Sequence, residues 1–94
     1  MKVIEALQIS GRGVVVIADV RLSDIAVTEI GLRSGMPVFF VTPSGLRIDS
    51  NLRSLELFSS PFNPNKPFAF VIEDGPTKAD IHPGSEIVFP EAAA

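Results

Sequence analysis

The sequence of 94 residues has no cysteine, no tryptophan, no tyrosine and a single histidine. Without cysteine the chain can form no disulfide, no thiolate metal site and no thiol-based active site. Its longest apolar stretch, Val14 to Ala18, is far shorter than the roughly 20 residues of a membrane-spanning helix. Glu5 also interrupts the apolar residues near the start, so no signal-peptide core is predicted. We therefore expect a soluble, cytoplasmic protein with no membrane contact.

Charge is also scarce, and acidic residues exceed basic ones. Charged residues make up 20% of the chain, and eight Lys and Arg against eleven Asp and Glu give a net charge of −3. Nucleic-acid binding depends largely on basic charge, so this balance disfavours RNA as a partner. Hydrophobic residues reach 46%, which is enough to offset the entropy lost on ordering the chain. We expect one domain over residues 1–90, followed by a disordered tail at 91–94.

Short β-branched runs separated by turn residues are abundant. Two such runs meet at Gly11–Gly13, which predicts a β-hairpin because glycine accepts the positive φ of the turn. Residues 25–27 fit either a short strand or a connecting loop. Strands are expected at 3–9, 14–20, 38–42, 46–49, 52–58, 68–73 and 85–89. Between the last two, one helical turn is expected at 77–81, capped by Thr77 with Asp80 three residues later.

Six or seven short strands with tight turns every 8–12 residues or so are typical of a small barrel or sandwich. No helix of ten or more residues is indicated. Because an exposed, apolar edge strand promotes aggregation, closure into a barrel is favoured over an open sheet. The fold class is therefore predicted to be all-β, with the six or seven strands closed into a small barrel.

The run Val3–Val16, which reads VIEALQISGRGVVV, resembles the opening of a known domain. It is similar to the second domain of translational GTPases of the elongation factor Tu type, where a strand leads into Ser/Thr-Gly-Arg-Gly-Thr-Val-Val. Residues 32–38, 52–58 and 75–88 resemble later turns and strands of that barrel. The resemblance implies a closed six-stranded Greek-key barrel without its GTPase domain, since no Gly-x-x-x-x-Gly-Lys-Ser/Thr loop is present.

In that family the barrel packs on the GTPase domain, touches ribosomal RNA and, in elongation factor Tu, holds the aminoacylated end of tRNA. The resemblance matches four residues to the pocket for the terminal adenosine: Glu5, Ile9, Val15 and Glu56. Ser59 stands where the family has an arginine, and Glu73 replaces an apolar residue. The lost cation and the added carboxylate make retained tRNA binding the less favoured interpretation.

No catalytic constellation is evident. Gly11–Gly13 is better interpreted as a hairpin turn that exposes Arg12 than as a phosphate-binding loop. His82 has no nucleophile at a suggestive spacing and is better interpreted as a solvated turn residue. Glu73 and Asp74 could contribute oxygens to a metal site, but adjacent strand residues point to opposite faces, which favours a solvated strand end. We expect no enzymatic activity and no metal, nucleotide or other cofactor.

Six of the seven phenylalanines fall in predicted strands, and five of these are expected in the core: Phe39, Phe58, Phe68, Phe70 and Phe89. Phe62 lies in a proline-rich loop, where it either pins the loop to the barrel or is presented to a partner. Phe39 and Phe40 are adjacent, so one of them should point outward. We place Phe40, with Arg12 and the Phe62 loop, on the outer face.

Two functions from different classes remain open. The first is a free-standing, non-catalytic binding module for a protein partner or for self-association as a homo-oligomer. Its candidate surface comprises Glu5, Arg12, Val15, Phe40, Glu56 and Phe62. The alternative is an RNA- or ribosome-associated accessory protein, for which the arginines would have to gather on one face: Arg12, Arg21, Arg33, Arg47 and Arg53.

Overall fold

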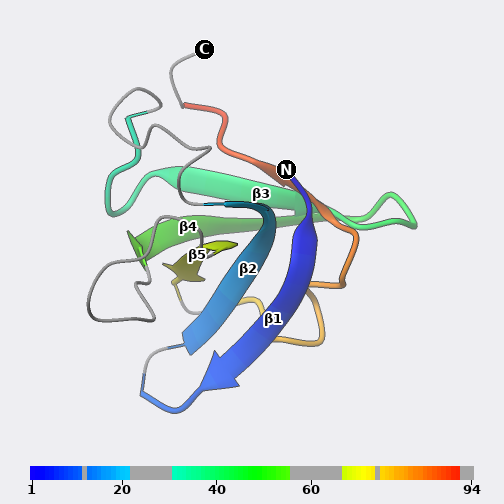
Figure 1. Cartoon of the computed structure of the whole chain (residues 1–94), viewed down its shortest axis with the longest axis horizontal. Coiled ribbons are helices and arrows are strands. Elements are labelled where there is room, and N and C mark those ends of the chain that lie inside the picture. Colours follow the sequence, from blue (N-terminus) through cyan, green and yellow to red (C-terminus); the bar gives the residue numbers. More distant parts are fainter. Residues whose placement is uncertain (12, 22–30, 56–66, 74, 92–94) are drawn as a thin grey trace.

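The computed structural model describes residues 1–11, 13–21, 31–55, 67–73 and 75–91 (Figure 1). Within these ranges the chain forms strands and turns, and no helix is present. The six strands are β1 (Val3–Ile9), β2 (Gly13–Arg21), β3 (Pro37–Val41), β4 (Arg47–Leu55), β5 (Pro67–Ile72) and β6 (Glu86–Val88). The expected all-β class is confirmed. The possible strand at 25–27 and residues 56–58 lie outside the described ranges.

The predicted hairpin is formed by β1 and β2, which pair antiparallel from Val3 opposite Ala18 to Ile9 opposite Gly13. Gly11 and Gly13 have φ values of 80° and 98°, in the region that side chains with a Cβ disfavour. The glycines were thus the correct signal for this turn. The ladder contains one irregularity, a register shift between Val3 and Glu5 on the outer strand.

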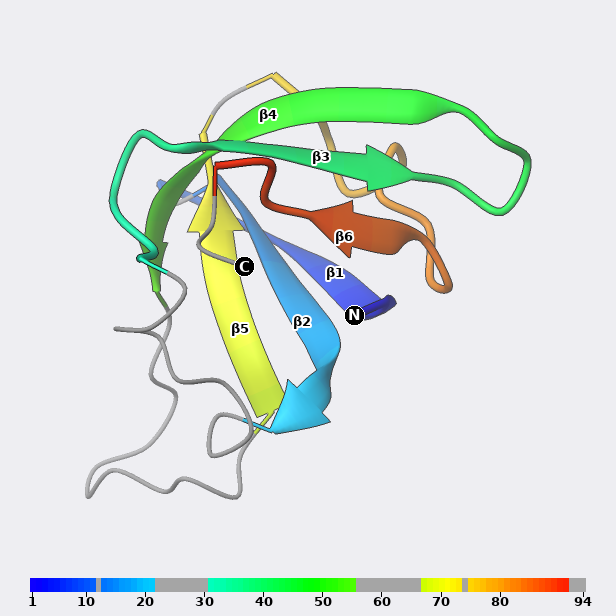
Figure 2. The same ribbon diagram turned by 90° about the horizontal axis from the view of Figure 1, so that it is seen from above.

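Strand β4 joins the two halves of the sheet. The sequence pattern predicted separate strands at 46–49 and 52–58, but a single strand runs from Arg47 to Leu55. Its first half pairs with β3, its second half pairs with β5, and a register shift lies between Leu52 and Ser54. A bulge of this kind bends a strand and increases its twist. The bend turns β3 and β6 across the layer formed by β1, β2 and β5 (Figure 2).

The expected closed barrel is wrong. The strand order is β1-β2-β5-β4-β3-β6, all antiparallel, so β1 and β6 are the two ends of an open half-barrel. An isolated bridge between Lys2 and Glu86 connects these ends. β6 has only three residues, and the ladder of β1 is irregular between Val3 and Glu5, next to the residues that face the end of the sheet at β6. Both features work against a continuous ladder between the end strands.

The concave side of the half-barrel holds the main core. Phe40, Phe68 and Phe70 are fully buried there, and the Phe70 ring lies 6.3 Å from Phe40, 5.5 Å from Phe68 and 5.3 Å from Phe89, centroid to centroid. On the opposite face of β1, β2 and β5, the buried residues Val15, Ala69 and Val71 form a second apolar cluster. Burial on both faces explains why β2 and β5 consist of nearly unbroken apolar runs.

The segment 75–85 lies beside β1 (Figures 1 and 2), and its Ile81 side chain, 1% exposed, belongs to the main core. The expected helical turn at 77–81 is wrong: two successive turns form instead, with bonds from Asp80 N to Thr77 O and from Ile81 N to Lys78 O. Pro83 and Gly84 follow at once, so the segment is too short to propagate a helix. The expected Thr77–Asp80 contact is present, because the Asp80 carboxylate accepts bonds from the Thr77 N–H and hydroxyl at 2.8 and 3.1 Å.

Candidate binding face on strands β3 and β4

Three of the six residues that the sequence grouped into one partner surface lie in the described ranges: Glu5, Val15 and Phe40. Phe40 and Val15 are both 0% exposed. The expected outward orientation of Phe40 is therefore wrong: on β3, Val38 and Phe40 face the core, whereas Phe39 is half-buried on the outer face. Glu5 is exposed on β1. Arg12, Glu56 and Phe62 lie outside the described residues.

Phe39 is part of a polar and aromatic cluster on the outer face of β3 and β4. The guanidinium carbon of Arg47 lies 3.8 Å from the centroid of the Phe39 ring. Arg47 Nε donates a hydrogen bond of 3.0 Å to Asp49 Oδ1, and Asp49 is the register partner of Phe39. Alternation along the two strands is what brings the three side chains together, because all of them stand on the same face.

A groove of about 380 Å³ continues this face toward β5. It is lined by Pro37, Asp49, Ser50, Asn51, Glu73, Gly75 and Pro76. Two contacts hold its walls together: Glu73 N donates to Asn51 O at 2.9 Å, and Ser50 Oγ donates to Glu73 O at 3.5 Å. The bend in β4 is what places residues 49–51 against the end of β5.

The groove is acidic and has apolar edges. The side chains of Asp49 and Glu73 supply its charge, and Pro37 and Pro76 supply rigid apolar surface. The Asp49 carboxylate accepts a hydrogen bond from Arg47, which offsets part of its charge. The second anionic group of the lining is the Glu73 carboxylate. This combination suits a ligand with a cationic group on a partly apolar chain.

Among the residues that line the groove, Glu73 is the one that the sequence suggested as a candidate site residue. It was weighed as a metal ligand and interpreted as part of a solvated strand end. The remaining residues of the groove come from segments 37, 49–51 and 75–76, which no local motif connects. The signal that could have pointed to this face is the alternation of Arg47, Asp49 and Asn51, which predicts one polar row on one side of a strand.

The residues considered for catalysis or metal binding do not come together within the described ranges. His82 is exposed in a turn, as expected. Asp74 is outside those ranges, and among the residues placed by the structure no three His, Asp or Glu side chains form a group that could hold a metal.

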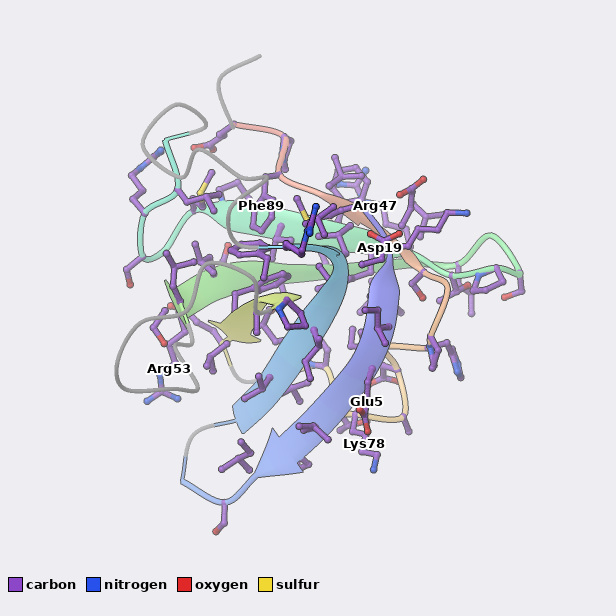
Figure 3. All side chains as sticks on the ribbon, viewed as in Figure 1. Glu5, Asp19, Arg47, Arg53, Lys78 and Phe89 are labelled. Atoms are coloured by element: carbon purple, nitrogen blue, oxygen red, sulfur yellow. The ribbon has the colours of Figure 1, made fainter. Side chains whose placement is uncertain are left out.

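The described arginines are only partly separated: Arg33 and Arg53 come from neighbouring segments, joined by a bond of 2.9 Å from Ser34 Oγ to Arg53 O, whereas Arg47 lies apart from Arg53. Arg47 and Arg53 lie at opposite ends of β4 (Figure 3). Arg33 is paired with Glu91 at 2.7 Å, which also ties the first residue of the expected tail to the domain. Arg47 is engaged with Asp49 and Phe39. Arg47, at least, is thus not available to a track of phosphate contacts shared with Arg53.

The described residues contain no helix of the length and apolar character needed to cross a membrane. Comparisons of the chain with protein-family models, with curated proteins and with solved structures find no match. The likeness to the second domain of translational GTPases, and the Greek-key connectivity that it implies, therefore stay predictions.

Proposed function

We propose that this chain is a non-catalytic binding module that receives a basic segment of a protein partner on the outer face of β3 and β4. The observation that carries the proposal is the acidic groove beside the half-buried Phe39 ring. Asp49 and Glu73 supply negative charge, while Phe39, Pro37 and Pro76 supply apolar contact area. Interfaces combine such rigid apolar groups with a polar rim.

Charge favours a cationic occupant. The chain has a net charge of −3, and the lining of the groove includes two carboxylates and no basic residue. A lysine or arginine side chain can lay its methylene stem along the prolines while its charged end reaches the carboxylates. An anionic partner would meet repulsion at the same place.

The proposal is tested by NMR titration with two probe peptides of equal length, one rich in lysine and proline and one rich in glutamate and proline. We expect the basic peptide to shift the amide signals of Asn51 and Gly75, and the acidic peptide to leave them in place. Exposed ion pairs contribute about 0.2–1 kcal/mol each, so the double variant Asp49→Asn, Glu73→Gln should weaken binding by roughly two- to thirtyfold.

Glu5→Gln is the matched control, because it removes an exposed carboxylate from β1, which does not line the groove. It should leave binding of the basic peptide unchanged. Equal binding of both peptides, or a loss caused by Glu5→Gln as large as that of the groove variant, would reject this face as the site.

Self-association and RNA binding are the two functions that the same protein should be tested for if the basic peptide does not bind. Light scattering after size-exclusion chromatography, over a wide range of protein concentration, would reveal a homo-oligomer. Retention of tRNA that weakens steeply as salt rises would favour the accessory-protein alternative, since release of counterions makes phosphate binding salt-dependent. A monomer that binds neither peptide nor tRNA would contradict both functions.

A further inference from the structure

The two ends of the half-barrel are held together by residues Met1–Val3, here named the strap. On one side the strap bonds to β6 and the residues just before it. Val3 N donates to Ser85 O at 2.8 Å, Gly84 N donates to Val3 O at 2.8 Å, and Ile87 N donates to Met1 O at 2.9 Å. The Met1 ammonium also lies 3.6 Å from the Glu86 carboxylate.

On its other side the strap is anchored to β2. Lys2 N donates to Asp19 Oδ1 at 2.8 Å, and Asp19 N donates to Lys2 O at 2.9 Å. One short segment thus connects two strands that lie far apart in the strand order of the sheet. Figure 3 shows Asp19 near the start of β1, whose first residue, Val3, is the last residue of the strap.

The strap is attached to the main core through its own residue Val3. Val3, Ile81 and Ile87 all belong to that core and are 3%, 1% and 5% exposed. β6 pairs with β3 over only three residues, Glu86–Val88, so few other ladder bonds hold it. If the strap leaves its place, β6 and the segment 75–85 lose a large part of their attachment. The β1–β2 ladder then loses its first pair, Val3 with Ala18, while its pairs from Glu5 onward and the β2–β5 ladder stay intact.

We propose that the strap is a conformational latch, and that its release opens the half-barrel between β1 and β6 before the rest of the sheet unfolds. In the closed state the strap satisfies backbone groups at both ends of the sheet. In the open state those groups are unpaired, and the core around Ile81 and Ile87 reaches solvent. Local openings of this kind occur at free energies below that of global unfolding. The latch does not depend on the groove, so either proposal can fail without the other.

Hydrogen exchange measured by NMR on two variants of the full chain tests the latch. Val3→Pro removes the N–H that donates to Ser85 O and keeps three side-chain carbons, whereas Val3→Ala keeps that donor and removes two side-chain carbons, so any loss of packing falls on the alanine control. We expect the Gly84 and Ile87 amides to exchange roughly tenfold faster in the proline variant than in the alanine variant. The protected amides of the β2–β5 ladder should exchange equally in both.

Equal exchange at Gly84 and Ile87 in the two variants would overturn the proposal, and so would an acceleration spread evenly over the sheet. Should Val3→Pro fail to fold, Asp19→Ala decides, because it removes only the side-chain anchor of Lys2. Faster exchange confined to Gly84 and Ile87 would then support the latch. Unchanged or uniformly faster exchange would reject it.

Discussion

The burial of Ile81 in the open side of the half-barrel predicts that Ile81→Ala is among the most damaging changes in the chain. The side chain is 1% exposed and belongs to the main core, although it comes from a turn and not from a strand. The substitution removes three carbons, worth about 2.4 kcal/mol at about 0.8 kcal/mol each. The cavity left behind adds to this, and measured Ile→Ala losses in cores are about 2–5 kcal/mol.

Urea denaturation followed by circular dichroism measures the loss, and Ile4→Ala is the matched control. Ile4 has the same side chain but is 50% exposed at the irregularity of the edge strand β1, so the same truncation leaves no enclosed cavity. We expect a loss near 1 kcal/mol for Ile4→Ala. For a domain whose total stability is about 5–15 kcal/mol, the difference between the variants is readily resolved. Equal losses would show that Ile81 does not complete the core.

Three further changes test the register and the turn. Phe40→Ala should cost about 3–5 kcal/mol in urea denaturation because the ring is fully buried, and a smaller loss than that of Phe39→Ala would contradict the observed alternation. Phe39→Ala should cost roughly 1–2 kcal/mol, and the contact of the ring with Arg47 accounts for about 0.5–1 kcal/mol of this loss. Arg47→Met removes that contact alone and should therefore cost about 0.5–1 kcal/mol. Asp80→Ala should cost about 0.5–2 kcal/mol by removing the acceptor of the Thr77 N–H, whereas Asp80→Asn keeps an oxygen there; identical thermal melting of both variants would refute that role.

Local patterns predicted the elements of this fold well. The glycines at 11 and 13 identified the β1–β2 hairpin, and β-branched runs identified five of the six strands close to their observed bounds. These features depend on residues a few positions apart, where backbone preferences and turn chemistry act directly.

Local patterns could not predict whether the sheet closes into a barrel, or which of Phe39 and Phe40 faces the core. Whether the sheet closes depends on the length of β6 and on the irregularity in β1, which are properties of distant pairings. Whether Phe39 or Phe40 faces the core is a question of one residue of register in a strand that is apolar at every position. The groove joins the middle of β4 to the end of β5, and the bend that brings them together follows from pairing with two different partners.

The apolar cluster on the second face of β1, β2 and β5 bears on how these strands find their alignment during folding. In a sheet with one face exposed to solvent, shifting a strand by one residue would bury its polar side chains, and this free-energy cost alone would select the native register. Val14, Val15 and Val16 are all buried, so such a slip would exchange one valine for another there, and the main cost within β2 would be the exchange of buried Ala18 for Asp19. The alignment of β2 therefore depends on Asp19 and on the tight turn with β1, and lengthening that turn by one residue in an Asp19→Ala variant should yield competing pairings instead of one uniformly weakened fold.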